Sequence, residues 1–157
     1  MTMPRWITRW LLAALLAMAA RRPPDVVIGE PDDPYLRRWY VIPRNRVFNA
    51  YFHHFLRSDD DRALHDHPWC NASILLRGDY IEHRPGRAPR LVREGGVYLR
   101  RASAAHRVEL IAGRSVMTLF ITGPKQREWG FLCPHGWRHW RDFTAGPRGE
   151  TIEKGCG

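Results

Sequence analysis

Short runs of apolar and aromatic residues, divided by Gly, Pro and Asp, organise the chain from Trp39 onward. Runs of this kind are typical of strands, and no helical periodicity follows residue 30. Tight turns are expected at Arg77-Gly78-Asp79 and Ala112-Gly113-Arg114, where glycine permits the reversal of a hairpin. The pattern predicts an antiparallel barrel or jelly roll. Its eight strands are expected near residues 39–43, 46–56, 69–77, 79–84, 96–100, 106–111, 115–122 and 127–132.

A different pattern occupies the N-terminus, where the apolar run Trp10–Ala20 lies between basic residues. Ala and Leu are strong helix formers, and Pro23-Pro24 would end a helix abruptly. The run is too short to span a bilayer. Its length and flanks also fit a secretory signal, although Arg21-Arg22 would be unusual directly after a cleavage point. We therefore predict a short helix, whose flanking arginines suit peripheral contact with a membrane surface.

These patterns divide the chain into three parts. Residues 1–36 are expected to form the N-terminal helix and a Pro-rich linker, residues 37–145 the barrel, and residues 146–157 a flexible tail. A chain of 157 residues accommodates one such domain. The stretch from Cys133 to Trp140 is rich in aromatic residues and His, and we expect it to pack over a mouth or an edge of the barrel.

The composition is strongly basic, with 25 Lys and Arg residues against 16 Asp and Glu residues. Such a balance raises the question of nucleic-acid binding. The arginines are scattered through the predicted strands and turns, however, and do not form one patch interleaved with aromatic residues. We interpret them as a solvated basic surface and predict no specific nucleic-acid partner.

Three cysteines without a CxxC motif predict neither a disulfide framework nor a zinc ribbon. Cys156 falls in the expected tail, whereas Cys70 and Cys133 are expected to be reduced thiols. Reduced thiols favour a cytoplasmic location, and secretion is the alternative if residues 1–20 are a signal. Cys133 and His139 lie six residues apart, but no third group completes a nucleophilic site in the sequence.

The chemistry concentrates at His65-Asp66-His67, which is followed by His106 about forty residues later. Residues two apart in a strand point to the same face, so the first two imidazoles can reach one ion. A third imidazole from a partner strand would close the site and leave positions open for water or substrate. Neutral imidazole suits zinc, copper, iron and nickel. Asp66 should point to the opposite face, where it forms a turn or orients an imidazole.

The residues around these histidines resemble the two sequence motifs of the cupin superfamily. The first motif, HDHPWCNASILLRG, places Gly78 seven residues after Asn71, and the second places Gly95 eleven residues before His106. Asn71 stands where the superfamily usually has an acidic ligand. Three further positions depart from the motifs: Asp59 and Ser103 each replace a Gly, and Arg101 replaces a Pro. The resemblance implies an all-β fold, the double-stranded β-helix or jelly-roll barrel, and a homodimer is common among cupins.

The resemblance also implies a divalent metal bound by His65, His67 and His106, with Asn71 as a weak neutral fourth ligand. Three neutral imidazoles leave the ion its full charge, which favours an anionic substrate. All-histidine ferrous sites occur in thiol dioxygenases and diketone-cleaving dioxygenases among cupins. The expected function is therefore that of a non-haem Fe(II) dioxygenase-type oxidoreductase acting on a small anionic molecule. Zinc, manganese and nickel are the alternative metals.

Three basic residues on predicted strands are candidates to bind the substrate anion through a bidentate guanidinium fork. They are Arg77, Arg100 and Arg107.

Two other functions fit the same resemblance. The missing acidic ligand also fits a cupin without turnover, which would serve as a binding, sensor or structural module. A metal-independent sugar isomerase or epimerase, with a His as base, is the third alternative, and the complete triad argues against it. His53 and His54 are adjacent on a predicted strand, so only one of them faces the interior, and we interpret both as core or surface residues.

Overall fold

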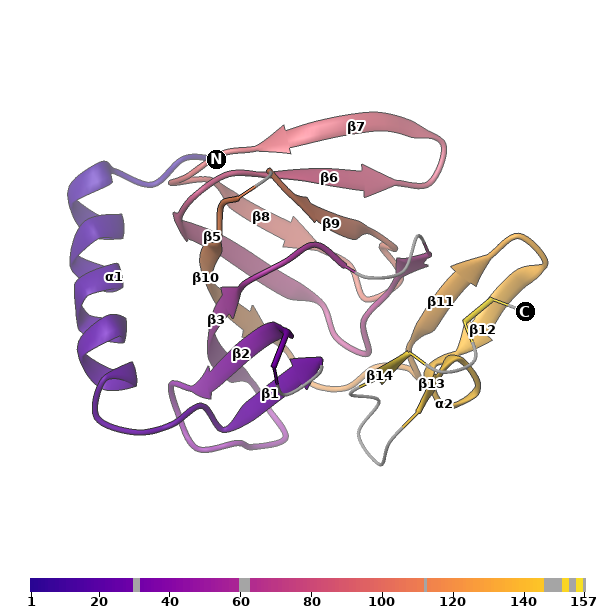
Figure 1. The fold of residues 1–157 in the computed structure, drawn as a ribbon, viewed down its shortest axis with the longest axis horizontal. Helices are drawn as coiled ribbons and strands as arrows, with labels where there is room; N and C mark the ends of the chain where they lie inside the picture. Colours follow the sequence, from indigo (N-terminus) through magenta and orange to yellow (C-terminus); the bar gives the residue numbers. More distant parts are fainter. Residues whose placement is uncertain (30–31, 60–62, 112, 146–150, 153–154, 157) are drawn as a thin grey trace.

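The computed structural model describes residues 1–29, 32–59, 63–111, 113–145, 151–152 and 155–156. In this part of the chain, six antiparallel strands form the larger of two facing sheets (Figure 1). In β5, Leu75 faces the barrel interior, whereas Ile74 and Leu76 face outward, so the sheet has two apolar surfaces. In spatial order its strands are β1 (Val26–Gly29), β2 (Pro34–Tyr40), β3 (Asn49–Phe55), β10 (Val116–Thr122), β5 (Asn71–Arg77) and β8 (Val97–Arg100).

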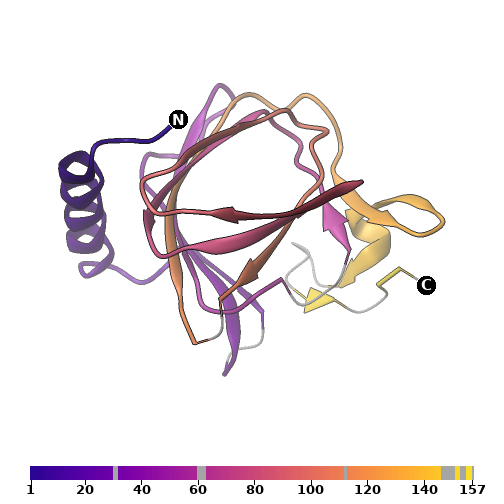
Figure 2. The ribbon, with the colours of Figure 1, turned by 90° about the horizontal axis from the view of Figure 1, so that it is seen from above.

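A smaller sheet closes the barrel over the inner face of the larger one (Figure 2). Its strands are β7 (Arg87–Val92), β6 (Tyr80–Arg84) and β9 (Arg107–Leu110). Buried residues from both sheets meet between them: Leu75, Tyr80, Val92, Val108, Leu110 and Val116. The predicted all-β barrel is therefore confirmed. Strand β7 was not predicted, because its sequence, RAPRLV, carries polar residues and a proline.

The turn at Gly78 has a different role from the predicted hairpin. It connects β5 to β6, which belong to different sheets, so it carries the chain from one wall of the barrel to the other. Gly78 has φ +81°, and a Cβ at this position would lie 2.8 Å from the carbonyl oxygen of Ser115. Only glycine fits this position without strain. The second predicted turn contains Ala112, which lies outside the described residues.

The predicted N-terminal helix is confirmed as α1 (Arg5–Ala19), which covers the outer face of the larger sheet (Figure 1). Leu15 is 7% exposed and packs against Trp39, Phe52 and other outward-facing residues of the sheet. Its N-terminal extension is anchored by a hydrogen bond from the Met3 N–H to the Gly95 carbonyl. Among the described residues, no helix has the length and apolar character needed to span a bilayer.

The stretch that we expected to be a Pro-rich linker contains two strands, which corrects the prediction. Residues Val26, Val27 and Ile28 of β1 pair with β2, and β2 pairs in turn with β3. The proline content pointed to a linker, but pairing with a distant strand outweighs a local preference of this kind. The barrel therefore begins before residue 37.

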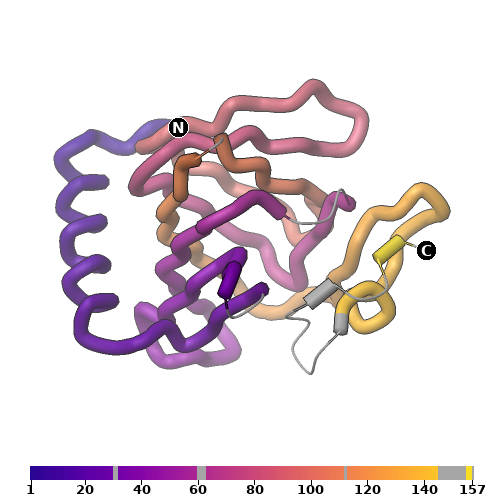
Figure 3. The backbone as a smooth tube through the Cα atoms, viewed as in Figure 1, coloured from indigo at the N-terminus to yellow at the C-terminus, as the bar shows by residue number. Residues whose placement is uncertain are grey.

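A third small sheet carries the aromatic C-terminal stretch to the edge of the barrel, as expected (Figure 3). It comprises β12 (Gly136–His139), β11 (Gly130–Cys133) and β4 (Leu64–His65). Beyond it lie α2 (Trp140–Phe143), β13 (Thr144–Ala145) and β14 (Thr151–Ile152). Most of the expected flexible tail, 146–157, lies outside the described residues.

The cysteines differ from the prediction, because Cys133 and Cys156 form a disulfide with a Cα–Cα distance of 5.4 Å. Cys133 is therefore neither a reduced thiol nor a candidate nucleophile in this structure. Cys70 is an exposed free cysteine. The sequence separation of 23 residues gives no indication of the pairing, which depends on the chain returning to β11.

We expect Cys156→Ser to lower the free energy of unfolding by about 2–3 kcal/mol, because the disulfide restricts the unfolded chain. Thermal unfolding with and without a reducing agent measures the effect. Cys70→Ser is the matched control and should leave the melting temperature unchanged. A Cys156→Ser variant that melts like the oxidised wild type would contradict the prediction.

Candidate metal centre

Backbone pairing brings the three histidines together. His65 ends β4 and forms an antiparallel bridge with His106, which directly precedes β9, through two N–H to carbonyl hydrogen bonds of 2.9 Å. The His67 N–H donates to the carbonyl of Ala102 at 3.1 Å. The third imidazole therefore arrives from a neighbouring segment, as the spacing of the HxH motif suggested. Two backbone contacts, the bridge between His65 and His106 and the hydrogen bond from His67 to Ala102, thus hold the three histidines together.

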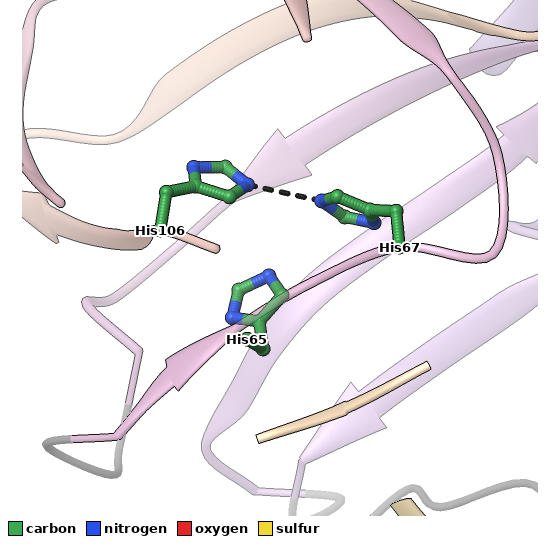
Figure 4. Close-up of side chains that lie close together, drawn as sticks. All are labelled: His65, His67 and His106. Atoms are coloured by element: carbon green, nitrogen blue, oxygen red, sulfur yellow. Dashed lines mark hydrogen bonds between the residues drawn. The ribbon is translucent and has the colours of Figure 1, made fainter. Parts of the chain in front are cut away.

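The three imidazole rings converge on one point (Figure 4). One ring nitrogen from each of His65, His67 and His106 lies within 4.8 Å of the others. The Nε2 atoms of His67 and His106 are 2.9 Å apart. His106 is buried, whereas His65 and His67 are partly exposed, so the cluster is open on one side. Three convergent nitrogen donors with an open side suit a divalent metal that also binds a substrate.

The protonation of the rings also fits a metal. Burial lowers the pKa of His67 well below its ordinary value, and the neighbouring His106, His65 and Arg100 lower it further. Burial lowers the pKa of His106 to about 4, against the opposing effect of Glu82. Both rings are therefore neutral near pH 7, which is the form in which imidazole binds a metal.

Glu82 of β6 is a site residue that the sequence analysis missed. Its carboxylate is fully buried, and its Oε1 lies 3.4 Å from Nδ1 of His106. Arg100 donates to the same oxygen through Nε at 2.9 Å and also through Nη2, and Arg90 pairs with the other oxygen. Burial opposes ionisation, but the contacts with His106 and Arg100 hold the pKa of Glu82 far below its ordinary value.

The Glu82 carboxylate lies close enough to Nδ1 of His106, at 3.4 Å, to orient this imidazole through its charge. Because an ionised carboxylate faces Nδ1, we infer that Nδ1 carries the proton and that Nε2 presents its lone pair to the cluster. The YIEHR sequence of β6 gives one indication of this role, because Glu82 lies two residues after the buried Tyr80 and so on the same face of the strand. The alternation does not say which face is inside.

Asn71, the proposed fourth ligand, begins β5 on the inner face of the sheet and is 5% exposed. Its Nδ2 donates to the Trp69 carbonyl at 3.5 Å, and its buried Oδ1 has no partner among the described residues. Buried oxygens almost always have a partner. This atom therefore fits a ligand or an ordered water within the barrel, and its role as a weak metal ligand stays a prediction.

Asp66 does not take either of the roles predicted for it. Its buried carboxylate accepts hydrogen bonds from the N–H of Gly130 at 2.8 Å and from Nε1 of Trp137 at 3.1 Å. It also pairs with Arg127. Asp66, which directly follows β4, thus ties the metal-binding segment to β11 and β12.

The structure does not bring the three predicted substrate arginines together. Arg77 ends β5 and lines a groove beside Arg5 and Arg9 of α1, on the outside of the barrel. Arg107 faces away from the interior and pairs with Glu109. The remaining one, Arg100, is an interior residue whose charge is already paired with Glu82.

A second inward-facing arginine, Arg38 of β2, was not predicted. Its Nε donates to Nε2 of His53 at 2.9 Å. The His53 ring stacks on Phe120 with centroids 5.2 Å apart, and Phe120 lies 5.6 Å from the ring of His67. His53 is buried, and His54 lies on the other face of β3, so only one of this pair faces inward, as expected.

Comparison with protein-family models and with curated proteins found no match. Among solved structures, the DMSP lyase DddQ from Ruegeria pomeroyi DSS-3 is 17% identical, with a TM-score of 0.60 over 79% of this chain and 68% of that chain. A cupin-2 domain from Rhodospirillum rubrum is 13% identical, with a TM-score of 0.57 over 71% and 76% of the two chains. A cupin-like protein from Thermotoga maritima is 15% identical, with a TM-score of 0.51 over 65% and 78%.

Identities this low establish the fold and nothing finer. The sheet order, the enclosed core and these structural neighbours agree on it. The chain has the cupin fold, a double-stranded β-helix barrel, and three of its histidines lie close enough together to bind a divalent metal ion.

Proposed function

We propose that this cupin is a metal-dependent oxidoreductase of the non-haem Fe(II) dioxygenase type that acts on a small anionic substrate. The observation that carries the proposal is the convergence of the imidazoles of His65, His67 and His106 on one point. A ferrous ion bound there would supply a redox-active Lewis acid that can bind both an anionic substrate and dioxygen.

The protein itself would position the reactants and limit the access of water. Glu82 orients His106, and the backbone bridge between His65 and His106 holds their spacing. The rings of Trp69 and Phe120 lie 6.2 Å and 5.6 Å from the ring of His67 and give the centre an apolar wall. An apolar wall strengthens electrostatic interactions at the centre, because it keeps the local dielectric low.

A metal-dependent lyase is the second candidate, because a DMSP lyase is among the proteins with the same fold. Both reactions would use the same three imidazoles. They differ in the need for dioxygen, since a lyase cleaves its substrate equally well without it. A cupin without turnover would bind the metal and catalyse neither reaction.

Metal analysis of protein purified without chelators or a His tag is the direct test. We expect about one metal ion per chain in the wild type, and little or none in His67→Ala and His106→Ala, because three imidazoles are needed for a stable site. His135→Ala, an exposed histidine between β11 and β12, is the matched control and should keep the wild-type content. A metal content near zero that His106→Ala does not change would overturn the proposal.

The iron-loaded protein is then tested for oxygen consumption with thiol, diketone and keto-acid substrates. Turnover that stops without oxygen supports the oxidoreductase, and turnover that continues without oxygen supports the lyase. Bound metal without either reaction supports the module without turnover.

We also propose that the outer face of α1 contacts an anionic membrane surface. Trp6 and Trp10 are 73% and 68% exposed on this face, beside the exposed Arg5 and Arg9. The first acidic residue of the chain is Asp25. Exposed tryptophans with neighbouring arginines suit the interface of an anionic bilayer.

Co-sedimentation with vesicles tests this contact. Vesicles that contain phosphatidylglycerol should bind the wild type, and purely phosphatidylcholine vesicles should bind it much less. The double variant Trp6→Ser/Trp10→Ser should lose most of the binding. Leu99→Ser removes an equally exposed apolar side chain from β8 and should bind like the wild type. Equal binding of all three proteins would contradict the proposal.

A further inference from the structure

Arg38 and Arg100 lie on inner faces of the barrel and differ in how their charges are balanced. Arg100 shares Glu82 with Arg90 and Arg84. Arg38 has no carboxylate partner among the described residues, although it is partly buried on the inner face of β2. A guanidinium that loses water without gaining an anion costs free energy. No carboxylate in the described part of the chain therefore balances the charge of Arg38 inside the barrel.

The contacts of Arg38 hold its guanidinium and leave one edge of it free. Its Nε donates to Nε2 of His53, and its Cζ lies 5.2 Å from the centre of the Tyr51 ring. Burial, with the Arg38 charge beside it, keeps the pKa of His53 well below its ordinary value, so this ring is neutral and can accept the bond. No described residue accepts a hydrogen bond from Nη1 or Nη2, and these atoms form the fork that matches a carboxylate.

Arg38 is connected to the histidine cluster by two ring contacts. His53 stacks on Phe120, and Phe120 packs against His67. The positive charge of Arg38 also contributes to the lowered pKa of His67, in addition to burial and the other histidines. One histidine and one phenylalanine thus separate the free guanidinium from the nearest candidate metal ligand.

A second uncompensated charge lies at the same end of β2. Arg44 is exposed, its Cζ lies 5.7 Å from the centre of the Tyr40 ring, and no described acid pairs with it. Its charge adds to the desolvation that lowers the pKa of Arg38. The combined field favours the approach of an anion to this side of the barrel.

We propose that Arg38 binds the carboxylate of the substrate, so that the substrate is a small carboxylic acid whose other end reaches the histidine cluster. The second half of this statement rests on the proposed function, whereas carboxylate binding at Arg38 does not require a metal. We therefore assign to Arg38 the binding of the substrate anion, which was expected of Arg77, Arg100 or Arg107, because no described carboxylate pairs with Arg38.

Calorimetric titration with propionate tests the proposal in metal-free and in zinc-loaded protein. We expect Arg38→Gln to weaken propionate binding about tenfold or more in both forms, because a charge-assisted bidentate contact is lost. Arg37→Gln removes the same charge from the exposed outer face of the same strand and should bind like the wild type. Propionamide, the neutral analogue, should not compete.

Metal content and melting temperature are measured on the same samples. Wild-type affinity of a folded Arg38→Gln variant would overturn the inference, even if the protein binds metal. A loss of propionate binding in Arg38→Gln, in a protein that never binds metal, would support the inference and overturn only the proposed function.

The conservative variant Arg38→Lys covers the case in which Arg38→Gln does not fold. Lysine keeps the charge but lacks the planar fork, so we expect a folded protein that binds propionate several-fold more weakly than the wild type. Wild-type affinity in Arg38→Lys, together with equal competition by propionamide, would overturn the proposed contact.

Discussion

Glu82→Gln should lower the free energy of unfolding by about 3–5 kcal/mol, because it removes one partner of a buried ion pair and leaves Arg100 unpaired. The Arg100 side chain is 7% exposed, so water cannot replace the lost carboxylate. The same substitution should weaken metal binding about 10–100-fold, since the carboxylate no longer orients His106. Chemical denaturation and competitive metal titration measure the two effects.

Glu109→Gln is the matched control for this prediction. Glu109 pairs with His83 and Arg107 on the outside of the barrel, and its side chain is 40% exposed. An exposed pair contributes only about 0–1 kcal/mol, so this variant should unfold and bind metal nearly as the wild type does. Equal stability losses in the two variants would show that burial of Glu82 is not what matters.

The double variant Glu82→Leu/Arg100→Met separates stability from orientation. Replacement of a buried ion pair by apolar residues of similar size is often neutral or stabilising. We therefore expect it to recover much of the lost stability, whereas the metal affinity should stay low because nothing faces Nδ1 of His106. A double variant with wild-type metal affinity would refute the positioning role of Glu82.

Asp66→Ala should lower the free energy of unfolding by about 3 kcal/mol, because it leaves the buried N–H of Gly130 and Nε1 of Trp137 without their acceptor. Asp66 lies between two candidate metal ligands and binds β11 across the bridge from β4. Its loss should therefore also loosen the spacing of His65 and His67 and reduce metal affinity. Thermal unfolding and metal titration of the same protein check both effects.

Asp66→Asn keeps an acceptor oxygen and should fall between the wild type and Asp66→Ala. Asp142→Ala, which removes an exposed carboxylate from α2, should leave both stability and metal binding unchanged. If Asp66→Ala melts like Asp142→Ala, the anchoring role that we assign to Asp66 is wrong.

Local patterns in the chain were enough to predict the barrel, the N-terminal helix and the three histidines. The alternation of apolar and polar residues marks a strand within a few positions, and the two-residue spacing of His65 and His67 already places both on one face. His106 could be added because its distance from Gly95 matches a known motif. These features depend on residues close together in the chain, and local geometry is sufficient to interpret them.

The partners of the charged residues required the folded chain. The alternation of a strand places Arg37 and Arg38 on opposite faces, and it places Glu82 on the face opposite its two neighbours. It does not say which face is inside, and a shift of one residue in register reverses every assignment. The Cys133–Cys156 disulfide and the pairing of β1 with β2 depend in the same way on segments that meet only after folding. The sequence therefore determines a barrel with a histidine cluster, and the register of its strands determines which charges are paired inside it, because strand pairing is a contact between distant residues.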